Sequence, residues 1–200
     1  MKILGLCGGS GSGKGFVSKI FAKFDIPSID ADEVYHGIVS KKSDCVNELS
    51  SVFGKEILNP DGSLNRRELA KIVFSEKNSR VDKLNEITHK FILTEVEKII
   101  ESYRKSSKKA VLFDAPLLFE AGFDKKCDKI ISVIADEELR IERIVKRDMI
   151  TEQKARLRIN FQKNDDFLIA NSDFVIYNSG DYENAYHQTE KIIKEIFKEI

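Results

Sequence analysis

The chain has 200 residues, 42% of them hydrophobic, which is enough for one globular domain with a sizeable core. Its 33 basic and 33 acidic residues cancel, so the overall charge attracts neither nucleic acid nor an anionic membrane. Three widely spaced cysteines, Cys7, Cys45 and Cys127, fit neither a zinc motif nor a disulfide framework. With no signal peptide and no apolar run of about 20 residues in view, we expect a cytoplasmic protein without nucleic-acid or membrane partners. We also expect a monomer, and the sequence leaves an oligomer open.

The first part of the chain predicts two buried strands with a helix between them, and then further helices. An apolar run over 2–8 ends in glycines, which is typical of a parallel strand, and residues 14–24 carry apolar side chains at helical spacing. A second strand is predicted over 26–32, before a helix that starts near Glu33. The remaining helices of this part are amphipathic and are predicted over 45–54, over 66–74 and from near Ser79.

The second part of the chain alternates strands with helices. Strands are predicted over 108–116, 129–135 and 173–180, and helices over 137–148, over 151–162 and in the C-terminal segment. Five short strands separated by helices indicate an α/β fold, with a parallel five-stranded sheet covered by helices on both faces. The segment 33–107 is longer than a crossover between two strands requires, so we interpret it as an inserted helical subdomain.

The segment GGSGSGKG (8–15) fits the phosphate-loop pattern G-x-x-x-x-G-K through Gly8, Gly13 and Lys14. It follows a predicted strand and opens a predicted helix, an arrangement that directs backbone N–H groups and the helix N-terminus at a bound anion. Lys14 would then reach the terminal phosphates of a nucleotide. The alternative is a glycine-rich turn with a surface lysine. A dinucleotide-binding loop is excluded, because no register gives G-x-G-x-x-G.

The position after the loop lysine departs from the pattern. It is normally Ser or Thr, whose hydroxyl binds Mg²⁺, but this chain has Gly15 followed by Phe16. Because Mg²⁺ keeps several waters and relies on substrate phosphates, we expect water to take the place of the missing hydroxyl.

Carboxylates stand at the ends of two predicted strands. Asp30 and Asp32 end the strand over 26–32, at the edge where open α/β sheets bind ligands. One of them could accept a proton from a substrate hydroxyl, and one could instead be the N-cap of the helix that follows. Asp114 ends another apolar strand, where it could orient a metal-bound water or cap the strand end.

Three arginines, Arg140, Arg143 and Arg147, share one face of the helix predicted over 137–148, at spacing i, i+3, i+7. Arginines of a closing lid stabilise the charge that spreads over the oxygens in phosphoryl transfer. A solvated helix face is the alternative for any one of them. We expect at least one to reach the phosphates, with Arg143 and Arg147 as the candidates.

Six segments, in order and over nearly the whole chain, resemble the dephospho-CoA kinase family of phosphate-loop kinases. They are LCGGSGSGKG, IPSIDADEVYH, DGSLNRRELAKIVF, LFDAPLLFEAGFDKKCDKIISV, RIVKRDMITEQKARLRINFQ and SDFVIYNSGD. The chain departs from the family at Gly15, where Ser or Thr is usual, and at His89-Lys90, where His-Pro is usual. The resemblance implies a phosphate-loop kinase fold. Its expected parts are a nucleotide core at 1–32, 108–147 and 172–200, a helical substrate-binding insertion at 33–107 and a small helical lid at 148–171.

The resemblance also implies an activity. The enzyme would transfer the γ-phosphate of ATP, with Mg²⁺, to the ribose 3′-hydroxyl of dephospho-CoA, which is the last step of coenzyme A biosynthesis. Asp32 matches the family's catalytic base, and Lys14 would bind the phosphates. The candidates for binding ATP are Gly9, Gly11, Ser12, Gly13, Lys14, Gly15, Phe16, Arg143, Arg147 and Asn178. The candidates for binding dephospho-CoA are Asp32, Arg66, Arg67, His89, Lys90 and Leu117. Asp114 is the candidate metal ligand, directly or through water.

Two other functions stay open on the residues alone. One is a kinase of the same group that acts on a nucleoside or a nucleotide. The other is a regulator that binds a nucleotide without turnover, which only the missing loop hydroxyl favours.

Overall fold

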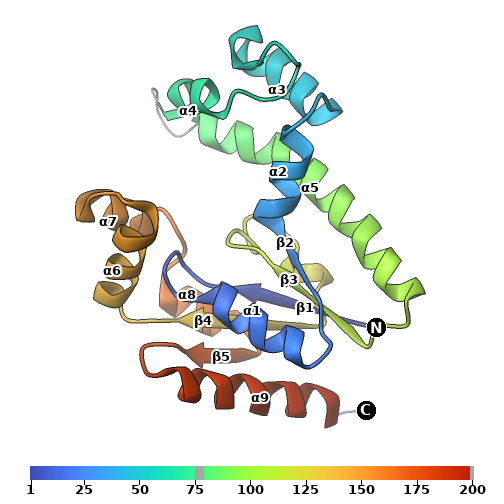
Figure 1. The fold of residues 1–200 in the computed structure, drawn as a ribbon, viewed down its shortest axis with the longest axis vertical. Helices are drawn as coiled ribbons and strands as arrows, with labels where there is room; N and C mark the ends of the chain where they lie inside the picture. Colours follow the sequence, from blue (N-terminus) through green and yellow to red (C-terminus); the bar gives the residue numbers. More distant parts are fainter. Residues whose placement is uncertain (75–78, 199–200) are drawn as a thin grey trace. The chain divides into compact units, whose positions relative to one another are not determined.

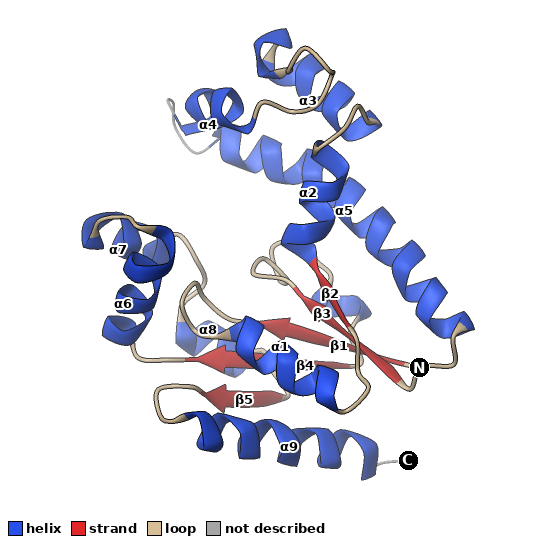
Figure 2. Cartoon of the chain, in the orientation of Figure 1, coloured by secondary structure: helices blue, strands red, loops and turns tan. Residues whose placement is uncertain are grey.

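The fold is taken from a computed structural model, which describes residues 1–74 and 79–198 (Figure 1). Within these residues a five-stranded sheet has the order β2-β3-β1-β4-β5. The strands are β1 (Lys2–Cys7), β2 (Ser28–Asp30), β3 (Ala110–Asp114), β4 (Lys129–Ile134) and β5 (Phe174–Tyr177). β1 pairs in parallel with β3 and with β4, and β4 pairs in parallel with β5, so the predicted parallel sheet is confirmed (Figure 2).

The central position of β1 determines where a ligand can bind. The chain passes from β1 to β2 and β3 on one side of it, and then crosses to β4 and β5 on the other. Such a reversal is a topological switch point, and ligands of open α/β sheets bind at the carboxyl ends of the strands there. The glycine-rich segment after Cys7 lies at this point.

The chain divides into two compact units, of which the first comprises Met1–Ile29 and Tyr103–Ile200. Its helices are α1 (Lys14–Lys23), α6 (Glu137–Asp148), α7 (Glu152–Asn160), α8 (Asp165–Ala170) and α9 (Tyr182–Lys198). α1 and α9 lie side by side along the sheet (Figure 1). The core of this unit is apolar, with Leu4, Leu6, Phe21, Ile131 and Ile196 fully or almost fully buried.

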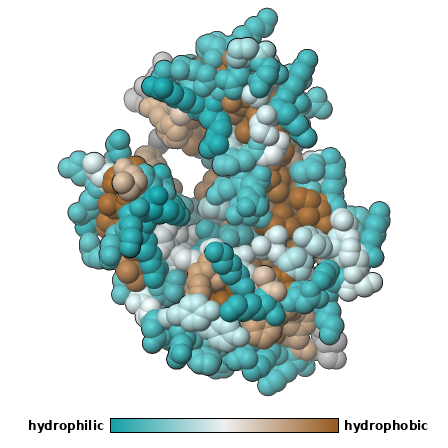
Figure 3. All heavy atoms as spheres, in the orientation of Figure 1, coloured by the Kyte–Doolittle hydropathy of each residue, from teal (hydrophilic) through white to brown (hydrophobic). Residues whose placement is uncertain are grey.

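The second unit, Asp30–Ser102, is helical. It contains α2 (Ala31–Val39), α3 (Asp44–Phe53), α4 (Arg66–Phe74) and most of α5 (Ser79–Lys105), with a short 3₁₀ turn at Lys55–Ile57. Its own apolar core includes Val46, Leu49, Ile57 and Val73. On the face in view in Figure 3, most of the surface is hydrophilic, with apolar patches between the hydrophilic residues.

Most of the predicted elements are present, and two differences bear on the site. The strand predicted over 26–32 ends at Asp30, and α2 begins at Ala31, because the Asp30 side chain caps that helix. The helix α8 was not predicted, since it has six residues and only Leu168 among them is buried. Among the described residues, no helix is long and apolar enough to cross a membrane.

Candidate active site

The phosphate loop joins β1 to α1 and ends in a helix start without a side-chain cap. Gly13 occupies the N-cap position of α1 in the left-handed region, with φ 96°. A side chain there would collide with a neighbour, since a Cβ on Gly13 would lie 2.0 Å from Nδ2 of Asn178. An uncapped N-terminus leaves first-turn N–H groups without a side-chain acceptor from the cap residue, which suits an anion.

Side chains from distant segments bind the loop from outside, at three consecutive carbonyl groups. Arg140 Nε donates to the oxygen of Ser10 at 3.0 Å, and Arg143 Nη1 donates to the oxygen of Gly11 at 3.1 Å. Asn178 Nδ2 donates to the oxygen of Ser12 at 2.7 Å. These bonds satisfy the carbonyl groups and fix the directions in which the loop peptides point.

A buried hydroxyl and a half-buried ion pair lie at the same loop. The side chain of Ser12 is 1% exposed, and its Oγ has no hydrogen-bond partner among the described residues. Lys14 Nζ lies 3.8 Å from Oδ1 of Asp114, which ends β3. A buried polar atom without a partner is costly, so the Ser12 hydroxyl calls for a ligand. A phosphate oxygen would supply the missing acceptor.

The two aspartates after β2 have different surroundings. Asp30 Oδ1 accepts hydrogen bonds from the backbone N–H of Asp32 at 2.8 Å and of Glu33 at 3.2 Å. Asp30 is therefore the N-cap of α2, as one of the two alternatives held. Asp32 lies in the first turn of α2, not on the strand as predicted, and its side chain is exposed.

Removing the cap should destabilise the protein. We expect Asp30→Ala to lower the free energy of unfolding by about 1 kcal/mol, because two backbone N–H groups of α2 lose their acceptor. Asp30→Asn keeps an acceptor oxygen and serves as the control, with a stability close to that of the unchanged protein. Urea unfolding measures both, and an Asp30→Ala variant as stable as Asp30→Asn would contradict the capping role.

The predicted substrate residues are spread over both units. Arg66 and Arg67 are exposed at the start of α4. Burial lowers the pKa of His89, so its imidazole is mainly neutral at pH 7. Lys90 Nζ lies 2.8 Å from Oε2 of Glu48 on α3, so its charge already has a partner. Leu117 follows β3 in the first unit, where it is half-buried.

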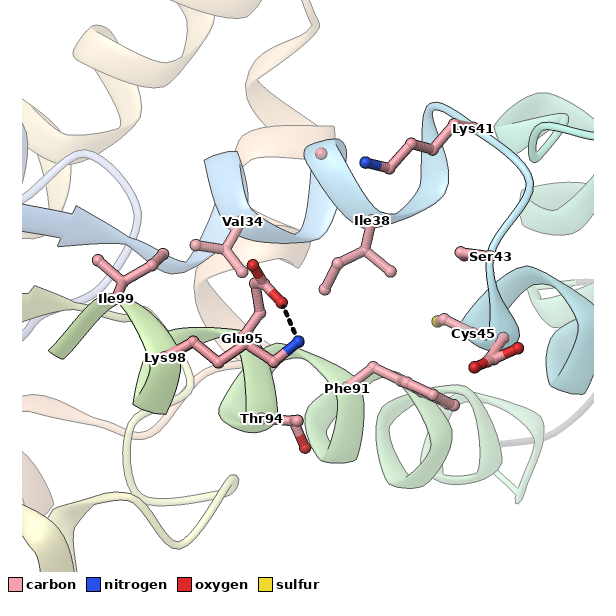
Figure 4. A pocket seen from close by; sticks show the side chains of 12 residues that line it. Val34, Ile38, Lys41, Ser43, Cys45, Phe91, Thr94, Glu95, Lys98 and Ile99 are labelled. Carbon is pink, nitrogen blue, oxygen red and sulfur yellow. Dashed lines mark hydrogen bonds and ion pairs between the residues drawn. The ribbon is translucent and has the colours of Figure 1, made fainter. Parts of the chain in front are cut away.

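A groove of about 390 Å³ lies within the helical unit, between α2 and α5 (Figure 4). Val34, Ile38 and Phe91 give it apolar walls, and an ion pair of Lys98 with Glu95 lies at its side. The predicted substrate residues are not among the described side chains that line it.

The arginine face of α6 divides between the loop and the solvent. Arg143 donates to the loop carbonyl of Gly11 and also to the oxygen of Asn178 at 3.1 Å, while its expected contact with the phosphates stays a prediction. Arg147 instead bonds to Asp148, and the hydrogen bonds from Arg147 lower the pKa of that carboxyl to about 2. Arg140, which is 5% exposed, was not among the predicted ATP-binding residues. Its shared face with Arg143 was the signal that could have identified it.

The loop geometry agrees with comparisons to known proteins. Residues 2–184 match the model of the family described as "Dephospho-CoA kinase". A dephospho-CoA kinase of Fusobacterium nucleatum is 38% identical over 97% of this chain and 98% of its own length. The solved dephospho-CoA kinase from Campylobacter jejuni is 25% identical, with a TM-score of 0.71 over 98% of this chain and 97% of its own. A solved shikimate kinase from Acinetobacter baumannii, 16% identical with a TM-score of 0.56 over 100% of this chain and 94% of its own, shares the fold. The predicted phosphate-loop kinase fold is thus confirmed, and the chain belongs to the dephospho-CoA kinase family of ATP-dependent enzymes.

Proposed function

We propose that this protein transfers the γ-phosphoryl group of ATP to the ribose 3′-hydroxyl of dephospho-CoA, giving CoA and ADP. The observation that carries the proposal is the loop around Ser12. Its carbonyl groups are held from outside, the Ser12 hydroxyl is buried without a partner among the described residues, and the uncapped start of α1 follows directly. These features suit a nucleotide phosphate, and the family membership supplies the acceptor.

Binding of ATP is assigned to the loop and to Lys14. The backbone N–H groups at the start of α1 would donate to phosphate oxygens, and the Lys14 ammonium would offset the charge of the terminal phosphates. Arg143 and Asn178 hold the loop through its carbonyl groups, so their effect on ATP passes through the loop geometry. Transfer then forms a bond from the 3′-oxygen to the γ-phosphorus and breaks the bond from that phosphorus to the ADP oxygen.

We assign Asp32 the role of general base, which accepts the proton of the 3′-hydroxyl. Its carboxylate is exposed in the first turn of α2, whereas that of Asp30 is engaged in the cap. As the 3′-oxygen attacks, its proton passes to a carboxylate oxygen of Asp32. The cap fixes where α2 begins, and with it the place of Asp32.

The residues present suit a Mg²⁺ ion that takes most of its ligands from the ATP phosphates and from water. Asp114 is a nearly buried carboxylate beside Lys14 and would bind the ion directly or through water. The described residues hold no group of three or more His, Cys, Asp and Glu side chains placed to share a metal. Mg²⁺ commonly binds through one or two carboxylates, substrate phosphates and water, and it would neutralise charge on the phosphates. Space for a water exists at Gly15, because a Cβ there would meet no atom within 4 Å.

Restoring the hydroxyl should not harm the enzyme. We expect Gly15→Ser to lower the Mg²⁺ concentration needed for half-maximal activity or to leave it unchanged, because the side chain enters open space. Activity titrated with Mg²⁺ at fixed ATP measures the effect, with Gly15→Ala as the control that adds bulk without a hydroxyl. If Gly15→Ser abolished activity while Gly15→Ala did not, water would not be filling the place of the hydroxyl.

The reaction itself is tested with purified protein, ATP, Mg²⁺ and dephospho-CoA, which should yield ADP and CoA. The same assay with a panel of nucleosides and nucleotides as acceptors tests the alternative, a kinase of the same group that acts on one of these compounds. If one of these acceptors is phosphorylated and dephospho-CoA is not, the substrate assignment fails. A single-turnover assay tests the other alternative, a nucleotide-binding regulator, which would bind ATP without transferring its phosphoryl group.

A further inference from the structure

One contact to the phosphate loop comes from the segment between α7 and α8. The backbone N–H of Ser10 donates a hydrogen bond to Oε1 of Gln162, with a distance of 2.7 Å. We propose that Gln162 is a positioning residue for ATP binding, because it holds the Ser10 peptide of the phosphate loop in place. This inference rests on the proposed binding of ATP at the loop.

The N–H and the carbonyl group of Ser10 are each bound by a side chain, one from the segment between α7 and α8 and one from α6. Gln162 accepts from its N–H, and Arg140 Nε donates to its carbonyl oxygen at 3.0 Å. Arg140 Nη1 in turn lies 3.3 Å from Oδ1 of Asp165, the first residue of α8. Since Asp165 is three residues beyond Gln162, these contacts form a closed ring from the loop through Arg140 and back to the loop.

The neighbours of Ser10 explain why the loop needs contacts from outside to hold it in one conformation. Gly9 and Gly11 flank it, and glycine peptides lose the most conformational freedom when they are ordered. Gly11 has φ 79° and a Cβ there would lie 2.5 Å from the Arg140 carbonyl oxygen, so this position does not tolerate a stiffer residue, and a Cβ on Gly9 would displace the Arg140 side chain that it would meet at 2.0 Å. The loop therefore gains rigidity from side chains outside it.

A loop that is already held loses less entropy when ATP binds, and this raises the affinity. The Ser10 N–H is bound to Gln162, whereas the Ser12 Oγ is left without a partner in the described structure. Gln162 thus affects the affinity for ATP by holding Ser10. It leaves the Ser12 hydroxyl available to donate a hydrogen bond to a phosphate oxygen.

The test replaces Gln162 with residues that lose the hydrogen bond. Gln162→Met keeps the length of the side chain without an acceptor oxygen, and Gln162→Asn keeps the amide but withdraws it by one methylene. Gln153→Met is the matched control, since Gln153 is an exposed residue of α7 on which the described structure places no loop contact. Binding of a non-hydrolysable ATP analogue is measured by calorimetry, and exchange of the Ser10 amide proton is measured by NMR without nucleotide.

We expect both Gln162 variants to bind the analogue about three- to tenfold more weakly, the typical effect of one hydrogen bond. The KM for ATP rises in parallel, while kcat at saturating ATP and the KM for dephospho-CoA stay within about twofold. Exchange of the Ser10 amide becomes faster. Gln153→Met changes none of these quantities, and a purely structural effect on the lid would not separate the KM for ATP from kcat.

Two results would overturn the inference. One is analogue binding within twofold of the unchanged protein in both Gln162 variants. The other is tighter binding, which would mean that the Gln162 oxygen competes with a phosphate for the Ser10 N–H. If Gln162→Met does not fold, Gln162→Asn decides alone. If the unchanged protein binds no ATP analogue, the proposed function fails instead. Exchange of the Ser10 amide proton still tests the hydrogen bond to Gln162, because it is measured without nucleotide.

Discussion

Asp32→Asn should lower kcat by about 10²- to 10⁴-fold, the usual contribution of a general base. The amide nitrogen and oxygen of Asn cannot take the proton that leaves the 3′-hydroxyl, so the attacking oxygen keeps it. The KM for ATP should change little, because the residues assigned to ATP are those of the loop and of Lys14. Release of ADP at saturating ATP and dephospho-CoA measures kcat, and ATP titration measures the KM.

A neighbouring residue provides the control for this variant. Glu33→Gln removes a carboxylate from the same first turn of α2, also exposed, so both variants lose a similar favourable interaction with the helix N-terminus. We expect Glu33→Gln to keep kcat within about threefold. If Asp32→Asn did no worse, Asp32 would have no part in the chemistry.

Gly13→Ala should reduce kcat/KM for ATP by about 100-fold, the cost of misplacing a binding group by about 1 Å. The left-handed conformation that Gly13 adopts is about 1–2 kcal/mol less favourable for alanine. The added Cβ would also lie 2.0 Å from Nδ2 of Asn178. The hydrogen bond from Asn178 to the Ser12 carbonyl must then break, and the loop loses one of the contacts that hold it from outside. Calorimetric titration with an ATP analogue separates this loss of binding from any change in kcat.

Gly15→Ala is the control for the loop, two residues along the chain. Its added Cβ meets no atom within 4 Å, and no left-handed φ constrains this position, so we expect nearly unchanged ATP binding. Equal losses in Gly13→Ala and Gly15→Ala would show that the loop responds to any added methyl group. Normal binding in Gly13→Ala would mean that the Asn178 contact does not support the loop.

The aspartates after β2 show how far local sequence can specify a site. The pattern placed two carboxylates at the end of a strand and gave two roles for them, base and cap. It could not assign the roles, because the residue at which β2 ends and α2 begins depends on the hydrogen bonds that the backbone N–H groups of Asp32 and Glu33 donate to the Asp30 carboxylate. The structure places Asp30 in the cap, and the base assignment of Asp32 stays a prediction.

The arginines of α6 show a different limit. Helical spacing predicted correctly that Arg140, Arg143 and Arg147 share a face, but spacing does not say how far along the helix the loop contact reaches. In the structure the contact ends at Arg143, and one turn later Arg147 bonds to Asp148. Arg140 is the most deeply buried of the three, and the sequence-based candidates for ATP omitted it.

The parallel sheet, the phosphate loop between β1 and α1, and the family could all be predicted from the sequence. These features depend on hydrophobic periodicity and on motifs within short segments, where neighbours in the chain are neighbours in space. The tertiary structure alone decided which side chains hold the loop. Asn178 and Ser12 are 166 residues apart, Gln162 and Ser10 are 152 apart, and Arg140 and Ser10 are 130 apart. Such contacts form only when β4, β5 and their helices pack beside β1, so no local pattern contains them.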